Sequence, residues 1–177
     1  MRRLLLVVTI LISCVGCDQT TKSVAKAYLS ETETISLLGD SVRLQIAKNY
    51  GAFLSAGASL PGELRSKVFS AGVALVLAVL LAYAFMSKKI NPIVAGATAL
   101  IVGGGLSNLI DRLAYGGYVL DFVNIGIGPV RTGIFNAADM CIMLGVALWI
   151  CGDRLWRSAL AISNGKLPSG QSSRERK

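Results

Sequence analysis

Ionisable side chains stand near the ends of long apolar segments in this sequence, where a charged group in a membrane is costly. Asp18 and Lys22 are four residues apart, and Asn108 is followed closely by Asp111 and Arg112. On a helix, Asp18 and Lys22 share one face, and Asn108 shares a face with each of the two charged residues after it. Helix caps and buried ion pairs use such groups, so for Asp18, Lys22 and Asp111 we give structural roles at least the weight of catalytic ones.

A second set of carboxyl groups lies farther along the chain. Asp121 interrupts an apolar connecting segment, and Asn136 and Asp139 are three residues apart at the start of another apolar run. Two facing carboxyl groups can share one proton, because both cannot ionise at close range. The ionised group can then take a proton from water, while the protonated group assists the carbonyl oxygen and the leaving amine. This is the chemistry of an aspartic peptidase.

The residue types that are absent narrow the other options. The sequence contains no histidine, which excludes Ser-His catalysis, Cys-His catalysis and a histidine-ligated zinc site. Aspartic-peptidase chemistry needs no metal and no cofactor, so we expect neither. The alternative for the same aspartates is a relay in a small proton- or cation-conducting membrane protein. We interpret the four cysteines as small packing residues; they are Cys14, Cys17, Cys141 and Cys151.

The apolar residues are grouped into segments long enough to cross a bilayer. Of the 177 residues, 53% are hydrophobic and only 16% are charged, and the mean hydropathy is +0.60. The runs 68–86, 93–110 and 134–151 are each 18 or 19 residues long. At 1.5 Å per residue, each can cross a hydrocarbon core of roughly 30 Å. The sequence therefore predicts an integral membrane protein.

The first apolar segment has two interpretations. Arg2 and Arg3, the apolar run after them and LISC at 11–14 fit a lipoprotein signal that is cut before Cys14. A lipoprotein normally carries a soluble body, however, whereas the rest of this chain is expected to cross the membrane three more times. We therefore expect a retained first helix at about 4–27, with the cleaved leader as the alternative.

We predict an all-α integral membrane protein with four transmembrane helices and a small extracytoplasmic β-sheet between the first two. The expected helices are at about 4–27, 67–87, 92–111 and 134–152, and the extracytoplasmic segment is at about 28–62. Within that segment, residues 42–46 alternate between apolar and polar, and they can pair with residues 35–38 around a turn at Gly39-Asp40.

The basic residues indicate a bilayer as partner and set the topology. The net charge is +8, but the basic residues stand where helices leave the bilayer, which favours phospholipid over nucleic acid. Their distribution predicts that both termini are cytoplasmic. We expect residues 1–162 to form a single membrane-embedded domain and the basic tail 163–177 to be disordered.

Five blocks of the sequence, taken in order, resemble bacterial lipoprotein signal peptidase (signal peptidase II). They are 18–22 (DQTTK), 49–55 (NYGAFLS), 104–112 (GGLSNLIDR), 119–123 (VLDFV) and 135–139 (FNAAD). The resemblance implies an aspartic endopeptidase of the bacterial cytoplasmic (inner) membrane, and we expect it to be a monomer. Such an enzyme cleaves prolipoproteins before a diacylglyceryl-modified cysteine. It also implies four spans, a sheet that cradles the substrate, and an active site near the outer face.

The same resemblance assigns roles to individual residues. The two catalytic aspartates of the family map onto Asp121 and Asp139. The substrate-binding or supporting positions map onto Asp18, Lys22, Asn49, Gly51, Asn108, Asp111, Arg112 and Asn136. The sequence departs from the family pattern at Phe53-Leu54, Ser107 and Met140. No departure removes a matched acid, so we expect the departures to change substrate preference or rate rather than abolish activity.

Overall fold

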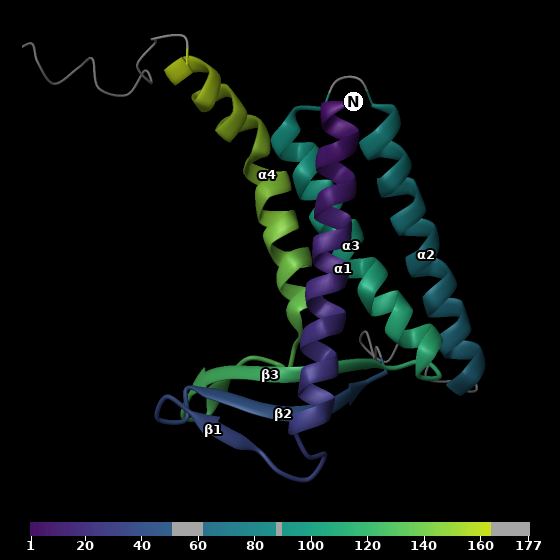
Figure 1. Ribbon diagram of the computed structural model, residues 1–177, viewed down its shortest axis with the longest axis vertical. Helices are drawn as coiled ribbons and strands as arrows, with labels where there is room; N and C mark the ends of the chain where they lie inside the picture. Colours follow the sequence, from purple (N-terminus) through teal and green to yellow (C-terminus); the bar gives the residue numbers. More distant parts are fainter. Residues whose placement is uncertain (51–61, 88–89, 164–177) are drawn as a thin grey trace, which may run out of the picture.

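Four long helices stand side by side and end on a small sheet (Figure 1). The computed structural model describes residues 1–50, 62–87 and 90–163. The predicted tail from 164 onward, Gly51 and Phe53-Leu54 therefore lie outside the described residues. The helices are α1 (Arg2–Tyr28), α2 (Gly62–Met86), α3 (Pro92–Ala114) and α4 (Ala137–Ser163).

Helix α4 differs most from the prediction. It was expected at about 134–152, but it begins at Ala137 and continues to Ser163. The hydrophobic run predicted the wrong start because Ile134 and Phe135 are apolar without being helical; Phe135 instead forms a β-bridge with Val123. It predicted the wrong end because a helix can continue past the last apolar residue of a membrane segment.

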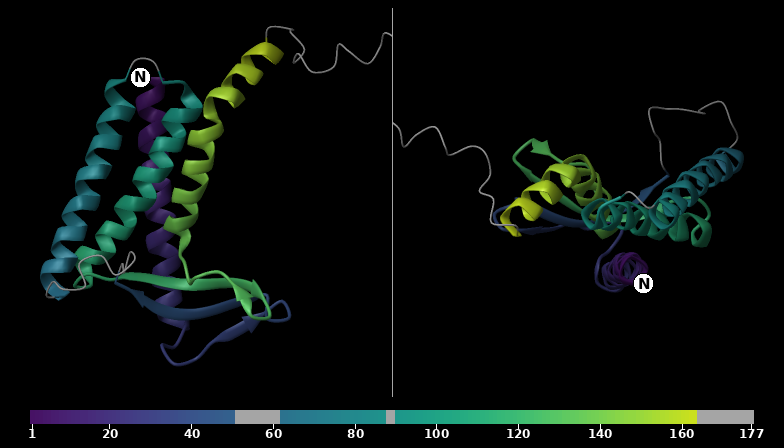
Figure 2. Two further views of the ribbon diagram at one scale, coloured as in Figure 1. Left: turned by 180° about the vertical axis from the view of Figure 1, so that it is seen from behind. Right: turned by 90° about the horizontal axis from the view of Figure 1, so that it is seen from above.

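Helix α3 lies at the centre of the bundle and packs against the other three helices (Figure 2). Its glycines allow this close approach. A Cβ atom on Gly103 would lie 2.8 Å from the Cβ of Cys14 in α1, and one on Gly104 would collide with the carbonyl oxygen of Ala138 in α4. Helices α1 and α4 therefore both approach α3 closely at the same helical turn.

Three of the described helices are long and apolar enough to cross a membrane. They are α1, the part Lys67–Met86 of α2, and α3. Large apolar side chains on α2 point outward, and Leu75, Val76 and Val79 are each more than half exposed. An outward apolar surface of this kind suits contact with lipid chains rather than with water.

The sheet lies across one end of the bundle and has four antiparallel strands in the order β1-β2-β3-β4. Strands β1 (Ile35–Leu37) and β2 (Val42–Asn49) form the predicted hairpin, with Ile35 opposite Leu44. The turn between them has positive φ angles at Leu38, Gly39 and Asp40.

The prediction that the sheet comes only from the segment between the first two helices is wrong. Strands β3 (Val119–Ile127) and β4 (Val130–Arg131) come from the connection between α3 and α4. The segment around Asp121 therefore is a strand, paired along β2, rather than an irregular connection. Val119 and Leu120 are adjacent and both buried, so no alternation of apolar and polar residues identified the start of this strand in the sequence.

Candidate active site

Asp121 and Asp139 come from two elements that meet where the sheet lies against the bundle. Asp121 is the third residue of β3, and its side chain is buried. Asp139 lies in the first turn of α4 and is half-buried. A helix N-terminus favours negative charge near its free N–H groups, so the start of α4 is a suitable place for a carboxylate.

Asn136 contacts both aspartates. Its Oδ1 accepts a hydrogen bond from the N–H of Asp139 at 3.0 Å, and its own N–H donates to Asp139 Oδ2 at 3.2 Å. This reciprocal arrangement is a capping box, and it explains why α4 begins here. The Nδ2 of Asn136 is left to donate to Asp121 Oδ1 at 2.6 Å. One buried carboxamide therefore fixes the two acids relative to each other.

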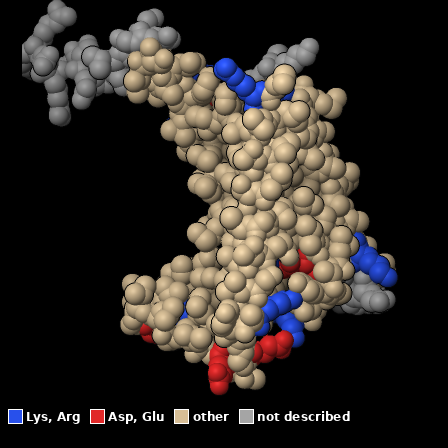
Figure 3. Space-filling view, in the orientation of Figure 1, with Lys and Arg blue, Asp and Glu red and all other residues tan. Residues whose placement is uncertain are grey.

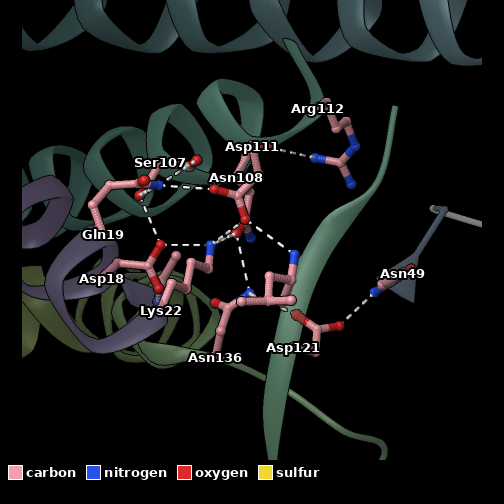
Figure 4. A network of polar contacts seen from close by, with 12 residues as sticks. Asp18, Gln19, Lys22, Asn49, Ser107, Asn108, Asp111, Arg112, Asp121 and Asn136 are labelled. Atoms are coloured by element: carbon pink, nitrogen blue, oxygen red, sulfur yellow. Dashed lines mark hydrogen bonds and ion pairs between the residues drawn. The ribbon is translucent and has the colours of Figure 1, made fainter. Parts of the chain in front are cut away.

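Two further carboxamides complete the surroundings of the acids (Figure 4). Asn49, at the end of β2, donates its Nδ2 to Asp121 Oδ2 at 2.9 Å. Asn108, in α3, donates its Nδ2 to Asp139 Oδ1 at 2.9 Å. Within the described residues, no lysine or arginine lies at ion-pair distance from either aspartate. The two acids are thus held by neutral hydrogen-bond donors.

The surroundings of Asp121 change its acidity. Burial raises the pKa of this carboxyl group to about 6, because an ionised carboxylate loses hydration in the site. The hydrogen bond from Asn49 opposes the rise, and the charge of Asp139 adds to it. Asp121 can therefore hold a proton near neutral pH, which an ordinary aspartate does not.

A separate group of charges centres on Lys22. Its Nζ lies 2.6 Å from Asp18 Oδ2 and 2.8 Å from Asp111 Oδ2, and all three side chains are buried. The acids also hold backbone: Asp18 Oδ1 accepts the N–H of Ala138, and Asp111 Oδ2 accepts the N–H of Leu120. This group therefore joins α1 to α3, to the start of α4 and to β3.

Asn108 connects the two groups of polar residues. Its Oδ1 accepts hydrogen bonds from Lys22 Nζ at 3.0 Å and from Asn136 Nδ2 at 3.2 Å, while its Nδ2 faces Asp139. The structure thus brings Asp18, Lys22, Asn49, Asn108, Asp111, Asp121, Asn136 and Asp139 into one hydrogen-bonded network. These residues come from α1, α3, α4, β2 and β3.

Arg112 stands beside this network and points away from Lys22 (Figure 4). Its Nη1 donates to the carbonyl oxygen of Asn108 at 3.3 Å. The side chain lines a cavity of about 440 Å³ between α2 and α3, together with Lys67 and Ser70. The adjacent Asp111 faces Lys22 instead, as expected for two consecutive residues of a helix.

Sequence reasoning missed two members of the network. Gln19 donates its Nε2 to Asp111 Oδ1 at 2.9 Å and to Ser107 Oγ at 3.0 Å. Ser107, noted only as a departure from the family pattern, donates its Oγ to Asp18 Oδ2 at 2.7 Å. Their positions could have indicated this, because Ser107 lies one helical turn before Asp111 and Gln19 follows Asp18 directly. The third departure, Met140, is mostly exposed.

Comparisons with known proteins identify the family of this chain. The family described as signal peptidase (SPase) II matches residues 10–153, which include every acid of the network. The chain belongs to the signal peptidase II family. It is accordingly an aspartic peptidase of the bacterial inner membrane, and the conducting alternative for the aspartates has no support from the comparisons.

Named relatives of this signal peptidase cover most of its length. A lipoprotein signal peptidase of Cronobacter sakazakii is 40% identical over 84% of this chain and 86% of its own. One from Moorella thermoacetica is 32% identical over 89% of this chain and 91% of its own. A solved bacterial membrane enzyme has a TM-score of 0.70 at 26% identity, covering 92% of each chain.

The described part of the site shows no arrangement for a metal ion. Among these residues, no three cysteine, aspartate or glutamate side chains are grouped as ligands. The carboxylate oxygens of Asp18 and Asp111 instead face Lys22 and N–H groups. The oxygens of the two candidate catalytic acids face carboxamides and the backbone N–H of Asn136.

Proposed function

We propose that this signal peptidase removes signal peptides from prolipoproteins by cleaving before a diacylglyceryl-modified cysteine, with Asp121 and Asp139 as its catalytic pair. The observation that carries the proposal is the shared contact of the two acids with Asn136. The side chain of Asn136 donates to the Asp121 carboxyl group, and its backbone N–H donates to the Asp139 carboxyl group. One buried residue thus holds both carboxyl groups, with a proton available at Asp121.

In the proposed reaction, one carboxylate takes a proton from a water molecule as that water attacks the scissile carbonyl carbon. The protonated partner donates a hydrogen bond to the carbonyl oxygen and then protonates the leaving amine. The raised pKa of Asp121 makes it the acid that keeps the shared proton in the free enzyme. Asp139, half-buried at the start of α4, is then the general base.

The carboxamides and Arg112 have supporting roles in this proposal. Asn49, Asn108 and Asn136 orient the acids without neutralising them. Arg112 lines the cavity next to the acids, where its guanidinium can bind backbone carbonyl groups of the substrate. Gly51, matched by the family resemblance, lies outside the described residues.

The bilayer orients the substrate. A diacylglyceryl group left among the lipid chains avoids transfer to water, which costs about 0.8 kcal/mol for each CH₂ group. The scissile bond next to the modified cysteine is therefore held near the membrane surface. We place the polar network at that depth, so binding alone brings the bond to the acids.

We further propose that α4 is the fourth transmembrane helix, that both termini are cytoplasmic, and that the sheet and acids lie at the outer face. Arg3 supports this, because it binds the carbonyl oxygens of Phe85 and Ser87 at the end of the bundle opposite the sheet. Arg154 and Arg157 lie toward the same end of α4, as positive residues at a cytoplasmic face should. Residues 1–162 would act as one monomeric domain.

Helix α1 is proposed to stay in the mature enzyme. Val7 is fully buried against Ala95 and Ala99 of α3, and cleavage before Cys14 would remove it. Mass spectrometry of the purified protein tests this point. A mature chain that still carries Val7 agrees with the proposal, and a lipid-modified Cys14 at the amino terminus contradicts it.

The main test uses purified enzyme in phospholipid vesicles and two matched peptides. Both contain a signal segment and a cysteine, but only one cysteine carries the diacylglyceryl group. We expect cleavage before the modified cysteine, identified by the masses of both products, and little cleavage of the unmodified peptide. Equal cleavage of both peptides would refute the lipid-dependent substrate, and cleavage of neither would refute the proposed function.

A further inference from the structure

The two faces of the sheet differ in chemistry. Residues paired across an antiparallel ladder lie on the same face, so the register assigns each side chain. Ile35 pairs with Leu44, and Val42 pairs with Ile125. One face carries only apolar side chains over most of its length: Ile35, Leu37, Val42, Leu44, Val123, Ile125, Ile127 and Val130. The other face carries Ser36, Arg43, Asn124 and Arg131.

The apolar face is on the same side of the sheet as the helices. Alternate residues of a strand point to the same face, and Asp121, Val123, Ile125 and Ile127 are alternate residues of β3. The irregularity in the ladder lies in β2, between Leu44 and Ala47, so β3 keeps its alternation. Asp121 points into the network at the helix ends. The apolar side chains that follow it therefore point toward the bundle side.

Much of this apolar face is not covered by the described protein. Ile125 is 45% exposed, Ile127 is 81% exposed and Val130 is 79% exposed. The outer half of the sheet projects sideways past the base of α4 (Figures 1 and 2). In Figure 3 the upper side of this projection, beside the hollow next to α4, is tan, and the visible charged atoms lie lower.

The polar face, by contrast, is covered by its own side chains. Arg131 donates to Asn124 Oδ1 and to the carbonyl oxygen of Asp40. Arg43 binds both carboxylate oxygens of Asp40. These contacts leave Asn124 only 6% exposed. Polar groups are thus gathered on the side away from the helices, and apolar groups are left open on the side toward them.

We propose that the projecting apolar face of the sheet lies on the bilayer beside α4 and inserts its side chains among the phospholipid chains of the adjacent leaflet. The helices beside it span that bilayer, so lipid is what occupies the space next to α4 at this end of the bundle. A sheet with an apolar face toward the lipid and a charged face toward water has the arrangement of an interfacial membrane anchor.

The membrane contact of the sheet affects the candidate active site, because strand β3 is part of both. Its first residues carry Asp121, and its last residues, with β4, form the projecting tip. Contact with the leaflet therefore fixes the depth of the strand that holds one candidate catalytic acid. The proposal needs only membrane-spanning helices, so it does not depend on the catalytic roles of Asp121 and Asp139.

Adjacent residues of β1 provide a matched pair of probes, since Leu37 lies on the apolar face and Ser36 on the polar face. Tryptophan is introduced singly as Leu37→Trp, Ile127→Trp or Ser36→Trp, in a protein that also carries Trp149→Phe and Trp156→Phe. Each variant is reconstituted in phosphatidylcholine vesicles whose acyl chains are brominated, without substrate, and a Tm in detergent near that of the parent protein confirms that it is folded. Val130→Trp replaces either apolar-face variant that does not fold, and Arg43→Trp replaces Ser36→Trp.

We expect bromine to quench the fluorescence at 37 and 127 several-fold more strongly than at 36. Equal quenching at the two faces would overturn the proposal. So would quenching at 127 that appears only after a diacylglyceryl peptide is added, because the face would then bind the substrate's lipid. Cross-linking of position 127 to a second copy of the chain, without quenching, would overturn it as well.

Discussion

The two groups of acids in this signal peptidase differ in the charge of the groups that contact them, although Asn108 connects the two. Asp18 and Asp111 lie on either side of Lys22, and their remaining oxygens accept a backbone and a side-chain hydrogen bond. Asp121 and Asp139 face carboxamides, which orient a carboxylate but carry no charge. Ion pairs with lysine hold the first group. In the second group, none of the described cations forms an ion pair that would offset the repulsion between the two carboxylates.

The difference indicates which acids can do chemistry. An aspartate paired with a buried lysine serves as the counter-ion of that lysine, because removing either partner leaves the other as an unpaired buried charge. Asp121 has no cation at ion-pair distance among the described residues. Burial raises its pKa, and the charge of Asp139 adds to the rise, so this acid keeps access to both protonation states. An acid that transfers protons needs surroundings like those of Asp121. An acid that only joins helices is better paired with a lysine, as Asp18 and Asp111 are.

The largest expected effect comes from removing a carboxylate of the proposed catalytic pair. Asp121→Asn and Asp139→Asn keep the size and hydrogen-bonding capacity of the side chain but cannot act as a base. We expect each to lower kcat by about 10⁴-fold at normal abundance, measured with the diacylglyceryl peptide. The matched control is Asp40→Asn, an acid of the sheet turn that pairs with Arg43. It should retain activity, and near wild-type turnover of either site variant would disprove the pairing.

Removing Lys22 from the other group should lower the stability of the protein more than its catalytic rate. Lys22→Ala leaves Asp18 and Asp111 buried without their cation, at a cost of about 3–5 kcal/mol. We expect a strong fall in membrane abundance and in Tm measured in detergent. Lys48→Ala is the control, because Lys48 pairs with Glu31 at the surface, and its Tm should hardly change. Normal Tm with a large loss of kcat would instead place Lys22 in the catalytic machinery.

The pH dependence should respond to Asn49 in a defined direction. The hydrogen bond from Asn49 stabilises the ionised form of Asp121 and so lowers its pKa. In wild type, kcat/KM should fall as pH rises through the pKa of Asp121, about 6, because the shared proton is lost. Asn49→Ala should raise that pKa and move this alkaline limb upward by about one pH unit.

The control for the pH profile is Gln45→Ala, a β2 residue whose partner is Thr34 rather than a site residue. Its profile should match wild type. A downward shift of the alkaline limb in Asn49→Ala would show that Asn49 does not stabilise the charged form of Asp121.

The smallest effect is expected at Ser107, within the lysine-centred group. Ser107→Ala removes the hydrogen bond to Asp18 but leaves Lys22 and the N–H of Ala138 on that carboxylate. We expect a loss of about 1–2 kcal/mol, seen as a modest fall in Tm, with kcat near wild type. A fall in kcat without a change in Tm would mean that the two groups are not separable.

The sequence predicted best those parts of the molecule that depend on local pattern. Runs of apolar residues located the membrane helices, and alternation around Gly39-Asp40 located the β1–β2 hairpin. Strand β3 was missed because its identity depends on pairing with β2, which is distant in the chain. The start of α4 was placed too early because the capping role of Asn136 outweighs the apolar character of the residues before it.

For the site, residue types and family resemblance selected polar residues that meet in one network, but they did not predict the contacts between them. Spacing on a helix predicted the Asp18–Lys22 pair. It could not predict that Asp111 would complete that pair from α3, or that Asn136 would touch both aspartates. Those contacts arise only when four elements pack together. The fold therefore determines that Asp18 and Asp111 pair with a lysine, whereas Asp121 and Asp139 face neutral donors.

The hydrogen bond from the N–H of Ala138 to Asp18 has a consequence for biogenesis. It joins the first helix made by the ribosome to the last, directly beside Asn136 and Asp139. A partly synthesised chain thus contains half of the acid pair and an unfilled acceptor on Asp18. With Asp121 and Asp139 in their proposed roles, cleavage requires the final helix to be in place.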